Sequence, residues 1–371
     1  MKSYLFLLSA LAVSCTGTAL RVYNVCDYGA SGDGVADCTE AFDSAIGKCS
    51  ADGGGRVDVP AGTYLCRTIF LRDNVELFLE EGAVVSGCPD ADSYSSFVPE
   101  DDLTKYDSGA GTLNANNSRD ARWNRALIIG DRVRNVTISG KGVIDGNHVR
   151  DSLGEEHMRG PHTILLAQCS DVVIKDISIT RASNYAVMGY ALENAVFKNI
   201  HITEGWDGIH VRGAENMVIS DCVLETGDDC IAGGFWHNAT IAGCSINSSC
   251  NGIRMIMPSV GVTVKDSYFT GPGHYPHRTS GGYRTLFGIT LEPGAWGPTS
   301  GRMDDIVLEN LKMDSVSSPL SVSIRKGVTA GTLTVRDVEA AGIYGTLSPV
   351  VSWNDCGFES IVVENFKITR K

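Results

Sequence analysis

The sequence predicts an all-β protein, a single-domain right-handed parallel β-helix with a short N-terminal capping helix. Segments of similar pattern start at Asn194, Asn216 and Asn238, a period of 22 residues, and periods of this size indicate a solenoid. Apolar residues alternate with period two inside the repeats and β-branched residues are frequent, which excludes a helical solenoid. The leucine and asparagine ladder of leucine-rich repeats is missing. We therefore expect each coil to lay short strands on the coil below it.

Looser copies of the repeat extend over much of the chain. Their spacing is 22 or 23 residues from Asp171 to Gly261 and mostly larger outside this stretch. The central coils are therefore regular, whereas the others carry insertions. The further copies begin at Asn135, Asp305, Thr332 and Ser360.

The chain begins with an expected secretory signal, residues 1–19. Lys2 supplies a positive start, Tyr4–Val13 is an apolar run, and small residues follow as far as Ala19, where we expect cleavage. The apolar run is too short to span a membrane. The stretch that ends at Cys15 also fits a lipoprotein signal, so a lipid anchor is an open alternative. In either case we expect a secreted or extracytoplasmic protein.

Residues 20–371 are predicted to form one β-helix domain, because no Pro/Ser-rich linker or block of charge divides them. The first strand is expected at Arg21–Val25. Asp37 and Glu40 then have the spacing of an N-cap and its capping-box partner, so an amphipathic helix should follow and end before Gly53. Such a helix would cover the first coil, which otherwise exposes an apolar face and an unpaired edge.

Charge and cysteine content exclude several functions. The net charge of −13 offers no basic stripe for nucleic acid. Cys222 and Cys244 occupy apolar repeat positions and are interpreted as small buried hydrophobes. Cys230 and Cys250 are the best candidates for a disulfide, since the alignment places them on adjacent coils. With no Cys-x-x-Cys motif and no recognisable histidine pair, we expect no metal and no cofactor. Separately, we expect the protein to be a monomer.

Aspartates gather at one position of the repeat. Asp207 and Asp229 each lie thirteen residues after the start of their repeats, Asn251 takes the same place in the next repeat, and Asp228 is adjacent. An aspartate beside glycine often only shapes a turn. Two at the same phase with a third beside them favour a site, because crowding raises the pKa of one carboxyl while others stay ionised. Glycoside hydrolysis needs such a set.

Alternation along the strands assigns the neighbouring side chains to faces. Ile209 and Val211 should point into the coil. His210, and by the repeat Ala232 and Arg254, should point outward beside the carboxylates.

Six stretches carry a family resemblance over essentially the whole mature length. They are DYGASGDGVAD, GGGRVDVPAGTYL, NVELFLEEGA, GVIDG, WDGIHV and TGDDCIA. In them the chain resembles glycoside hydrolase family 28, the polygalacturonases and their relatives, although Gly205 and Trp206 replace the family's Asn-Thr. The resemblance implies inverting hydrolysis of glycosidic bonds in pectin or a related plant cell-wall polysaccharide. It implies Asp228 as general acid, with Asp207 and Asp229 activating the water.

The chain departs from the family where substrate is bound. Cys250 and Asn251 stand where the family usually has Gly-His, and Thr290 and Glu292 stand in place of its Arg and Lys. A cationic pair for a sugar carboxylate is therefore missing, and an acid would repel that carboxylate. We expect a neutral sugar at the cleavage subsite, with Trp206 as a stacking platform.

Other residues are candidates to restore a carboxylate contact, namely Arg254 and the insertion Gly271–Phe287. A second insertion, Val98–Arg125, is expected to form the opposite wall of the cleft. The candidate substrate-binding residues are Trp206, His210, Asn251, Arg254, Thr290 and Glu292.

Two other functions remain open at this point. A pectate lyase shares the β-helix but would use Ca²⁺, which an acidic cluster can bind, and an arginine base. A carbohydrate-binding or adhesive β-helix would have no catalytic use for the three aspartates.

Overall fold

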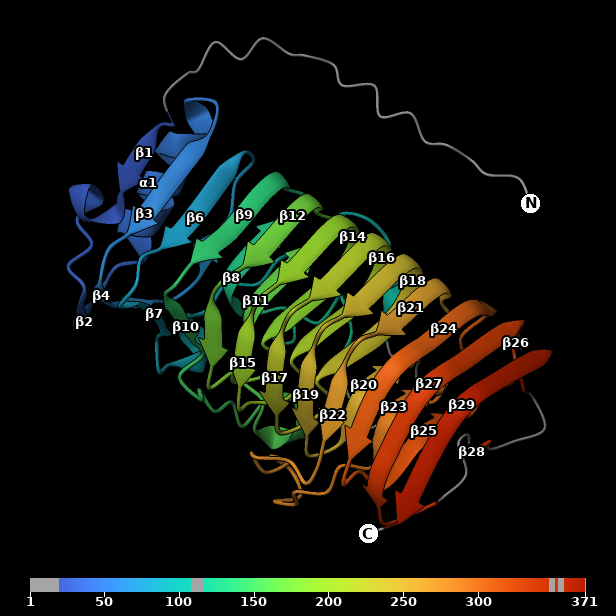
Figure 1. Cartoon of the computed structure of the whole chain (residues 1–371). Coiled ribbons are helices and arrows are strands. Elements are labelled where there is room, and N and C mark those ends of the chain that lie inside the picture. The colour runs from blue at the N-terminus through green and yellow to red at the C-terminus, as the bar shows by residue number, and fades with distance from the viewer. Residues whose placement is uncertain (1–19, 108–115, 347–350, 353–356, 371) are drawn as a thin grey trace.

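The computed structural model describes residues 20–107, 116–346, 351–352 and 357–370. The expected signal peptide, residues 1–19, and the alternative anchor at Cys15 lie outside them. The described chain forms a right-handed parallel β-helix whose coils follow one another from the N-terminal to the C-terminal end (Figure 1). This confirms the predicted fold class.

Three ladders of parallel strands run along the stack, and β14, β16 and β18 bend so that each belongs to two of them. The first ladder contains β1 (Val22–Asn24), β3 (Gly55–Val59), β6 (Val75–Leu79), β9 (Arg134–Gly140), β12 (Ser170–Lys175), the second halves of β14 (Val187–Lys198), β16 (Ile209–Ser220) and β18 (Ile231–Ala242), then β21 (Val260–Lys265), β24 (Gly301–Asp314), β27 (Thr332–Ile343) and β29 (Ser360–Arg370).

The other two ladders are built from shorter strands. The second contains β2 (Asp33–Asp37), β4 (Gly62–Cys66), β7 (Ala83–Gly87), β10 (Val143–Asp145), β13 (Ser178–Thr180), β15 (His201–Thr203), β17 (Val223–Thr226), β19 (Ser245–Ser248) and β22 (Tyr268–Thr270), which pairs with the end of β24. The third contains β5 (Ile69–Phe70), β8 (Ala126–Asp131), β11 (His162–Ala167), the first halves of β14, β16 and β18, then β20 (Asn251–Met255), β23 (Phe287–Leu291), β25 (Ser318–Val322) and β28 (Val351–Ser352). A short strand, β26 (Val328–Ala330), pairs with the start of β24.

The predicted capping helix is present as α1 (Thr39–Ala51), and it buries an apolar face that includes Phe42 and Ile46. Its N-cap is Cys38 instead of the expected Asp37. The Asp37 carboxylate still accepts a hydrogen bond from the Thr39 amide, at 2.9 Å. Four short 3₁₀ segments complete the described elements: η1 (Val25–Tyr28), η2 (Ala91–Ser93), η3 (Thr104–Tyr106) and η4 (Glu155–His157).

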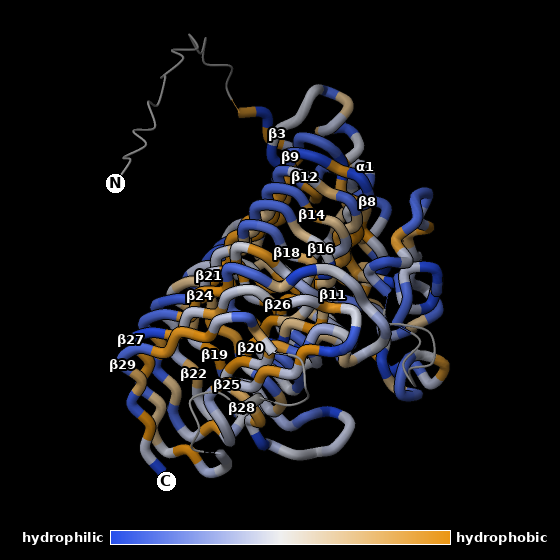
Figure 2. The backbone as a smooth tube through the Cα atoms, turned by 90° about the vertical axis from the view of Figure 1, so that its right-hand side faces the viewer, coloured by the Kyte–Doolittle hydropathy of each residue, from blue (hydrophilic) through white to orange (hydrophobic). Residues whose placement is uncertain are grey.

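Like residues stack on like residues inside the coils. In the third ladder Ile209 pairs with Ile231, which pairs with Ile253, and all three side chains are buried. His210 is in register with Ala232, and Ala232 with Arg254. The alternation of apolar and polar residues along the coils (Figure 2) therefore has the phase that the sequence predicts.

The strands of the second ladder lead into those of the third through short turns, and these turns carry the aspartates. Asp207 lies between β15 and β16, while Asp228 and Asp229 lie between β17 and β18. None of the helices in the described ranges has both the length and the apolar composition that crossing a membrane requires.

Candidate active site

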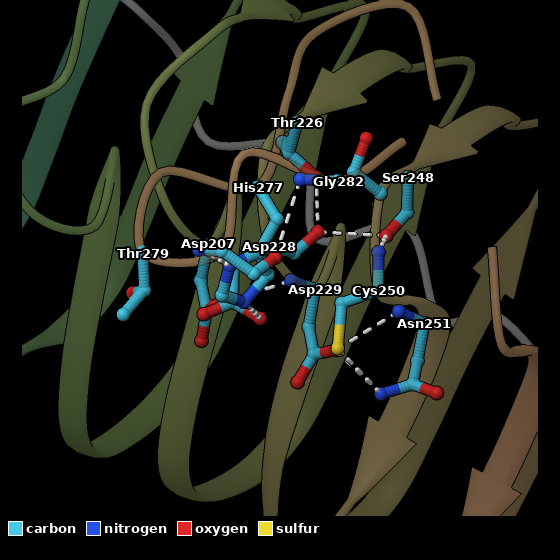
Figure 3. Close-up of polar contacts among 12 residues, drawn as sticks. Asp207, Thr226, Asp228, Asp229, Ser248, Cys250, Asn251, His277, Thr279 and Gly282 are labelled. Carbon is cyan, nitrogen blue, oxygen red and sulfur yellow. Dashed lines mark hydrogen bonds and ion pairs between the residues drawn. The ribbon is translucent and has the colours of Figure 1, made fainter. Parts of the chain in front are cut away.

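The turns bring the three aspartates together (Figure 3). The Asp229 amide donates a hydrogen bond to Oδ1 of Asp207 at 3.2 Å. Asn251 repeats this contact one coil on, because its amide and Nδ2 donate to Oδ1 of Asp229 at 3.1 and 2.7 Å. One oxygen of each aspartate lies within 4.8 Å of the others. The stacking inferred from the 22-residue repeat is therefore present in the structure.

Burial and mutual repulsion make this cluster retain protons. Asp207, Asp228 and Asp229 are 4, 9 and 3 % exposed. Burial raises the pKa of Asp207 well above its ordinary value, and the charges of Asp228 and Asp229 add to the shift. Burial also raises the pKa of Asp229 to about 6, although the Arg254 guanidinium opposes this rise. Since such groups titrate together, the proton belongs to the cluster and not to one residue.

His210 holds Asp207 from the outer face of β16. Its Nδ1 lies 2.6 Å from Oδ2 of Asp207, and its Nε2 accepts a hydrogen bond from Nε of Arg212 at 3.0 Å. Burial, followed by the charge of Arg212, lowers the pKa of His210 well below its ordinary value. The ring is therefore neutral, and its Nδ1–H donates to Asp207. Tyr185 stacks on the ring at a centroid distance of 4.6 Å.

This geometry gives His210 a positioning role beside the expected contact with substrate. Both ring nitrogens are hydrogen-bonded and one face is covered, so His210 positions Asp207, and it also lines the pocket.

Arg254 joins two acids on the neighbouring coils. Its Nη1 lies 3.4 Å from Oδ2 of Asp229, and its Nε donates to Oε1 of Glu292 at 2.5 Å. Its guanidinium also lies 5.0 Å from the centre of the Trp296 ring. Glu292 thus shares the positive charge of Arg254 with Asp229, which weakens the expectation that Glu292 repels a sugar carboxylate. Thr290 is 2 % exposed beside Arg254 and does not line the pocket.

Trp206, the expected stacking platform, is 2 % exposed, although it lines a second pocket beside the site. The guanidinium of Arg159 lies 3.8 Å from the centre of its ring and covers that face. The same arginine approaches Asp228, with 3.7 Å between Nη2 and Oδ2. Its Nη1 is buried and has no hydrogen-bond partner among the described residues.

The predicted Cys230–Cys250 disulfide is absent, since both thiols are free. Cys230 follows the outward Asp229, so alternation turns its sulfur into the core, where it contacts Oγ1 of Thr226 at 3.1 Å. Cys250 takes the phase of Asp228 and points outward, where Nδ2 of Asn251 donates to its sulfur at 3.2 Å. The two sulfurs therefore lie on opposite sides of the wall. All ten cysteines in the described part of the chain are free.

Asn251 also differs in role from the expectation. It is 3 % exposed, and its Nδ2 is directed at Asp229 and at the Cys250 sulfur. Asn251 therefore holds the Asp229 carboxylate by hydrogen bonds, just as the Asp229 amide holds the Asp207 carboxylate one coil earlier.

His277 was not chosen as a site residue from the sequence, although its loop was noted. The loop after β22 brings its Nε2 to 3.7 Å from Oδ1 of Asp228 (Figure 3). The Ser280 amide donates to its Nδ1 at 3.2 Å, so Nδ1 is an acceptor and the ring N–H is on Nε2, facing Asp228. A histidine thus reaches the acids from a loop, where the family motif would place one on the coil.

Arg159, Arg212 and Tyr185 were also missed. Arg212 lies two residues after His210, so alternation places it on the same face and provided a signal that was overlooked. Arg159 belongs to an insertion between β10 and β11, outside the repeat, so the repeat assigns it no phase.

The three aspartates lie in the wall of a pocket that contains about 380 Å³ of empty space. The residues that line it are Asn116, Arg159, Tyr185, Asp207, His210, Arg212, Asp228, Asp229, Ala232, Arg254, Ile256 and Trp296. Asn116 belongs to the insertion Val98–Arg125, and this part of the expected opposite wall does lie at the site.

Two groups at the site have donor atoms close enough together to hold a metal ion. One is the three aspartates, and the other is Asp228, Cys250 and His277. The guanidinium groups of Arg159 and Arg254 already face Asp228 and Asp229. Their positive charge disfavours Ca²⁺ at the aspartates, which the lyase alternative would need.

Comparison with known proteins identifies the family. The model of the family described as rhamnogalacturonase A/epimerase, pectate lyase-like, matches residues 22–274. A probable polygalacturonase of Vitis vinifera is 29 % identical over 241 residues, which are 61 % of this chain and 47 % of the relative. A polygalacturonase of Prunus persica is 26 % identical over 404 residues, with 99 % of this chain and 92 % of the relative covered. The chain thus spans about half the length of the grapevine relative.

Solved structures show the same fold at lower identity. An exopolygalacturonase from Thermotoga maritima has a TM-score of 0.62 and 18 % identity, over 93 % of this chain and 92 % of that chain. The surface adhesin PfbA of Streptococcus pneumoniae has a TM-score of 0.63 and 15 % identity, over 94 and 92 %. Because enzymes and an adhesin share this fold, the fold alone does not decide function. The chain belongs to the rhamnogalacturonase A/epimerase, pectate lyase-like family, in agreement with its polygalacturonase-like motifs.

Proposed function

We propose that this protein is a glycoside hydrolase that cleaves pectin or a related cell-wall polysaccharide. The observation that carries the proposal is the pocket in which Asp207, Asp228 and Asp229 crowd together, with pKa values of Asp207 and Asp229 raised. A site with both a retained proton and ionised carboxylates meets the requirement of acid–base hydrolysis. Its polygalacturonase relatives support the same class of substrate.

Asp228 is assigned as the general acid. It is the most exposed of the three at 9 %, and its two oxygens face Arg159 and His277. It is therefore the carboxyl that a glycosidic oxygen reaches first, and the proton that the cluster shares is donated through it. Asp207 and Asp229 lie deeper, and in their ionised form they activate the water. His210 and Asn251 hold them in place by hydrogen bonds.

The family resemblance implies inversion of configuration, and we propose it for this chain. A retaining glycosidase needs a carboxylate nucleophile that faces the acid across the scissile bond, about 5 to 5.5 Å away. The three aspartates come from two neighbouring turns of one wall, and they are the only acids among the described residues that line the pocket. None of the described acids lines the side opposite Asp228, so the proposed nucleophile is a water molecule.

The sugar at the cleavage subsite is proposed to be neutral. A buried carboxylate needs a cation that is free to bind it. Arg254 is paired with Asp229 and Glu292, and Arg159 with Asp228. Arg212 donates to His210 and to the carbonyl oxygens of Tyr106 and Asn116. We also propose export through the signal at residues 1–19, and a monomeric protein.

The test of catalysis is Asp228→Asn. Loss of the proton donor should lower kcat about 10²- to 10⁴-fold, because only the transition state is affected, while substrate binding stays nearly unchanged. Substrates with very good leaving groups should be rescued. The control is Asp221→Asn, at an exposed turn of the same repeat, which should keep parental activity. Equal rates for Asp228→Asn and the parent on an active substrate would exclude the hydrolase assignment and favour an adhesive or binding role.

Proton NMR of the first product tests the stereochemistry. We expect the anomer opposite to that of the cleaved bond, because water attacks directly. A product with the anomeric configuration of the substrate would show a retaining mechanism, and an unsaturated product that absorbs in the ultraviolet would show a lyase.

A further inference from the structure

The carboxyl of Asp228 lies beside a thiol and an imidazole from two other segments of the chain (Figure 3). Asp228 lies between β17 and β18, Cys250 stands directly before β20 on the next coil, and His277 belongs to the loop after β22. One carboxylate oxygen of Asp228, the sulfur of Cys250 and one ring nitrogen of His277 lie within 4.8 Å of one another. Three different kinds of donor atom thus meet at one point of the site.

The thiol and the imidazole are departures of this chain from the family pattern. Cys250 stands where the family usually has glycine, and His277 belongs to the insertion Gly271–Phe287. Hydrolysis as proposed above uses the carboxyl of Asp228 and needs no thiol. The cluster therefore calls for a role of its own.

The Asp228 carboxylate has an oxygen to offer to a metal ion. Its Oδ1 lies 3.7 Å from Nε2 of His277, and its Oδ2 lies 3.7 Å from Nη2 of Arg159. Both distances exceed that of a hydrogen bond, so neither oxygen is tightly held by these partners. Arg159 approaches the oxygen that is turned away from His277, and it therefore leaves Oδ1 accessible to an ion.

The carboxylates of Asp207 and Asp229 are held more closely. Oδ2 of Asp207 lies 2.6 Å from Nδ1 of His210, and Oδ1 of Asp229 accepts a hydrogen bond from Nδ2 of Asn251 at 2.7 Å. An ion among the three aspartates would compete with these bonds and would find oxygen donors alone. Sulfur and imidazole nitrogen are donors that Zn²⁺ prefers, whereas Ca²⁺ and Mg²⁺ prefer oxygen.

We propose that Asp228, Cys250 and His277 bind Zn²⁺, and that the bound ion inhibits the enzyme. Three protein ligands and one water complete the tetrahedral coordination of zinc. Bonds of about 2.0 to 2.3 Å in this geometry place the donor atoms about 3.3 to 3.6 Å apart. The 3.7 Å between Asp228 and His277 is already close to this spacing. A carboxylate and a thiolate together neutralise the two charges of the ion.

Binding moves two protons. The Cys250 thiol releases its proton to solvent, because the thiolate is the ligand. The ring hydrogen of His277 moves from Nε2 to Nδ1, because Nε2 supplies its lone pair to the ion. The hydrogen bond from the Ser280 amide to Nδ1 is then lost, but Ser280 is exposed and its amide can donate to water instead.

The ion can reach the site from solvent. Cys250 and His277 are both partly exposed, and His277 also lines the second pocket, which contains about 780 Å³ of empty space. Once bound, the ion occupies an oxygen of Asp228 and keeps this carboxyl from carrying the proton for the glycosidic oxygen. Inhibition therefore rests on the proposed function, whereas binding of the ion does not.

The test of binding titrates the untagged protein with Co²⁺ and then with Zn²⁺. Co²⁺ should produce the absorption band of charge transfer from sulfur to cobalt, and Zn²⁺ should remove the band by displacing Co²⁺. Cys250→Ser should lack the band. His277→Gln, a change in a loop, should weaken Zn²⁺ binding by more than the about 10- to 100-fold that loss of a supporting residue costs.

Two matched controls come from the same chain. Cys88→Ser removes another partly exposed thiol, and His274→Gln removes another histidine of the same loop, which is paired with Glu225. Both variants should keep the band and bind Zn²⁺ as the parent does. A parent without the band, or equal Zn²⁺ affinities of the parent and Cys250→Ser, would overturn the inference.

Initial rates on an active substrate give the second readout. Zn²⁺ should inhibit the parent and a chelator should restore its rate, whereas Ca²⁺ at the same concentration should have no such effect. Measured against their own metal-free rates, Cys250→Ser and His277→Gln should resist Zn²⁺, and the two controls should not. If the band depends on Cys250 but the metal-free parent cleaves no glycoside, the proposed function fails while the metal site stands. If the metal-free parent is active and Zn²⁺ does not bind, the reverse holds.

Discussion

The buried carboxyl of Asp229 lowers the stability of the folded protein. Its pKa is about 6 in the folded protein against an ordinary value of 3.8, so between these values the folded state binds more protons than the unfolded state. Stability therefore falls as the pH rises from about 4 to 6, and the full penalty is present at neutral pH. The raised pKa of Asp207 acts in the same direction.

Asp229→Asn should therefore stabilise the protein at pH 7. The substitution removes a buried charge and keeps an oxygen that can accept the hydrogen bonds from Asn251. The gain should reach up to about 3 kcal/mol at pH 7 and vanish below about pH 4, where the parent is protonated. Urea unfolding at a series of pH values measures it. Asp221→Asn should show no such pH dependence, and destabilisation by Asp229→Asn at pH 7 would contradict the argument.

Prediction from sequence worked at residues that the repeat places in register. Asp207 and Asp229 were found because equal phase in a β-helix means direct stacking. Arg159 lies in an insertion outside the repeat, so the repeat does not predict where its side chain lies. Its position over Trp206 depends on how the insertion packs against the coils. Glu292 was interpreted as an unpaired acid because its partner, Arg254, lies one coil away and the ion pair depends on side-chain conformation.

At the scale of elements, the residues at the turns explain why the repeat can be recognised in the sequence. Asn194, Asn216 and Asn238, which set its phase, all have positive φ, between 52 and 57°. Asparagine tolerates this left-handed conformation better than most residues. Their side chains also form a ladder, in which Nδ2 of Asn238 donates to Asn216 at 2.7 Å and that of Asn216 donates to Asn194 at 3.1 Å.

The two contributions can be separated at Asn216. Asn216→Gly keeps the left-handed turn and loses the ladder contacts, whereas Asn216→Ala loses both. We expect both variants to be less stable than the parent. The free energy of unfolding of the alanine variant should be lower than that of the glycine variant by about 1 kcal/mol. Chemical unfolding of the three proteins compares them. Equal stability of the two variants would show that the turn conformation contributes nothing.

Element boundaries were harder to predict than element type. The sequence predicts separate short strands, but β14, β16 and β18 are each twelve residues long and pass through a bend. The bend occurs because a left-handed residue, such as Ala191 with φ 49°, sits inside a continuous strand. An alanine in this conformation gives no turn signal in the sequence.

At the scale of the whole molecule, the net charge opposes an acidic substrate. The net charge of −13 repels a long polyuronate. Exposed charges interact over roughly 30 Å at 0.01 M salt but only about 8 Å at 0.15 M. At low salt a long acidic polymer therefore meets the field of the entire protein, whereas at higher salt it meets only the charges close to it.

Salt should therefore affect acidic and neutral substrates differently. Raising the ionic strength from about 0.01 to 0.15 M should lower KM for a long acidic polysaccharide, because repulsion is screened. KM for the carboxyl-reduced polymer should stay nearly unchanged, because it carries no charge to be repelled. Initial rates at the two salt concentrations measure both. If KM for the acidic polymer rises with salt, local attraction outweighs the net charge over the whole binding surface.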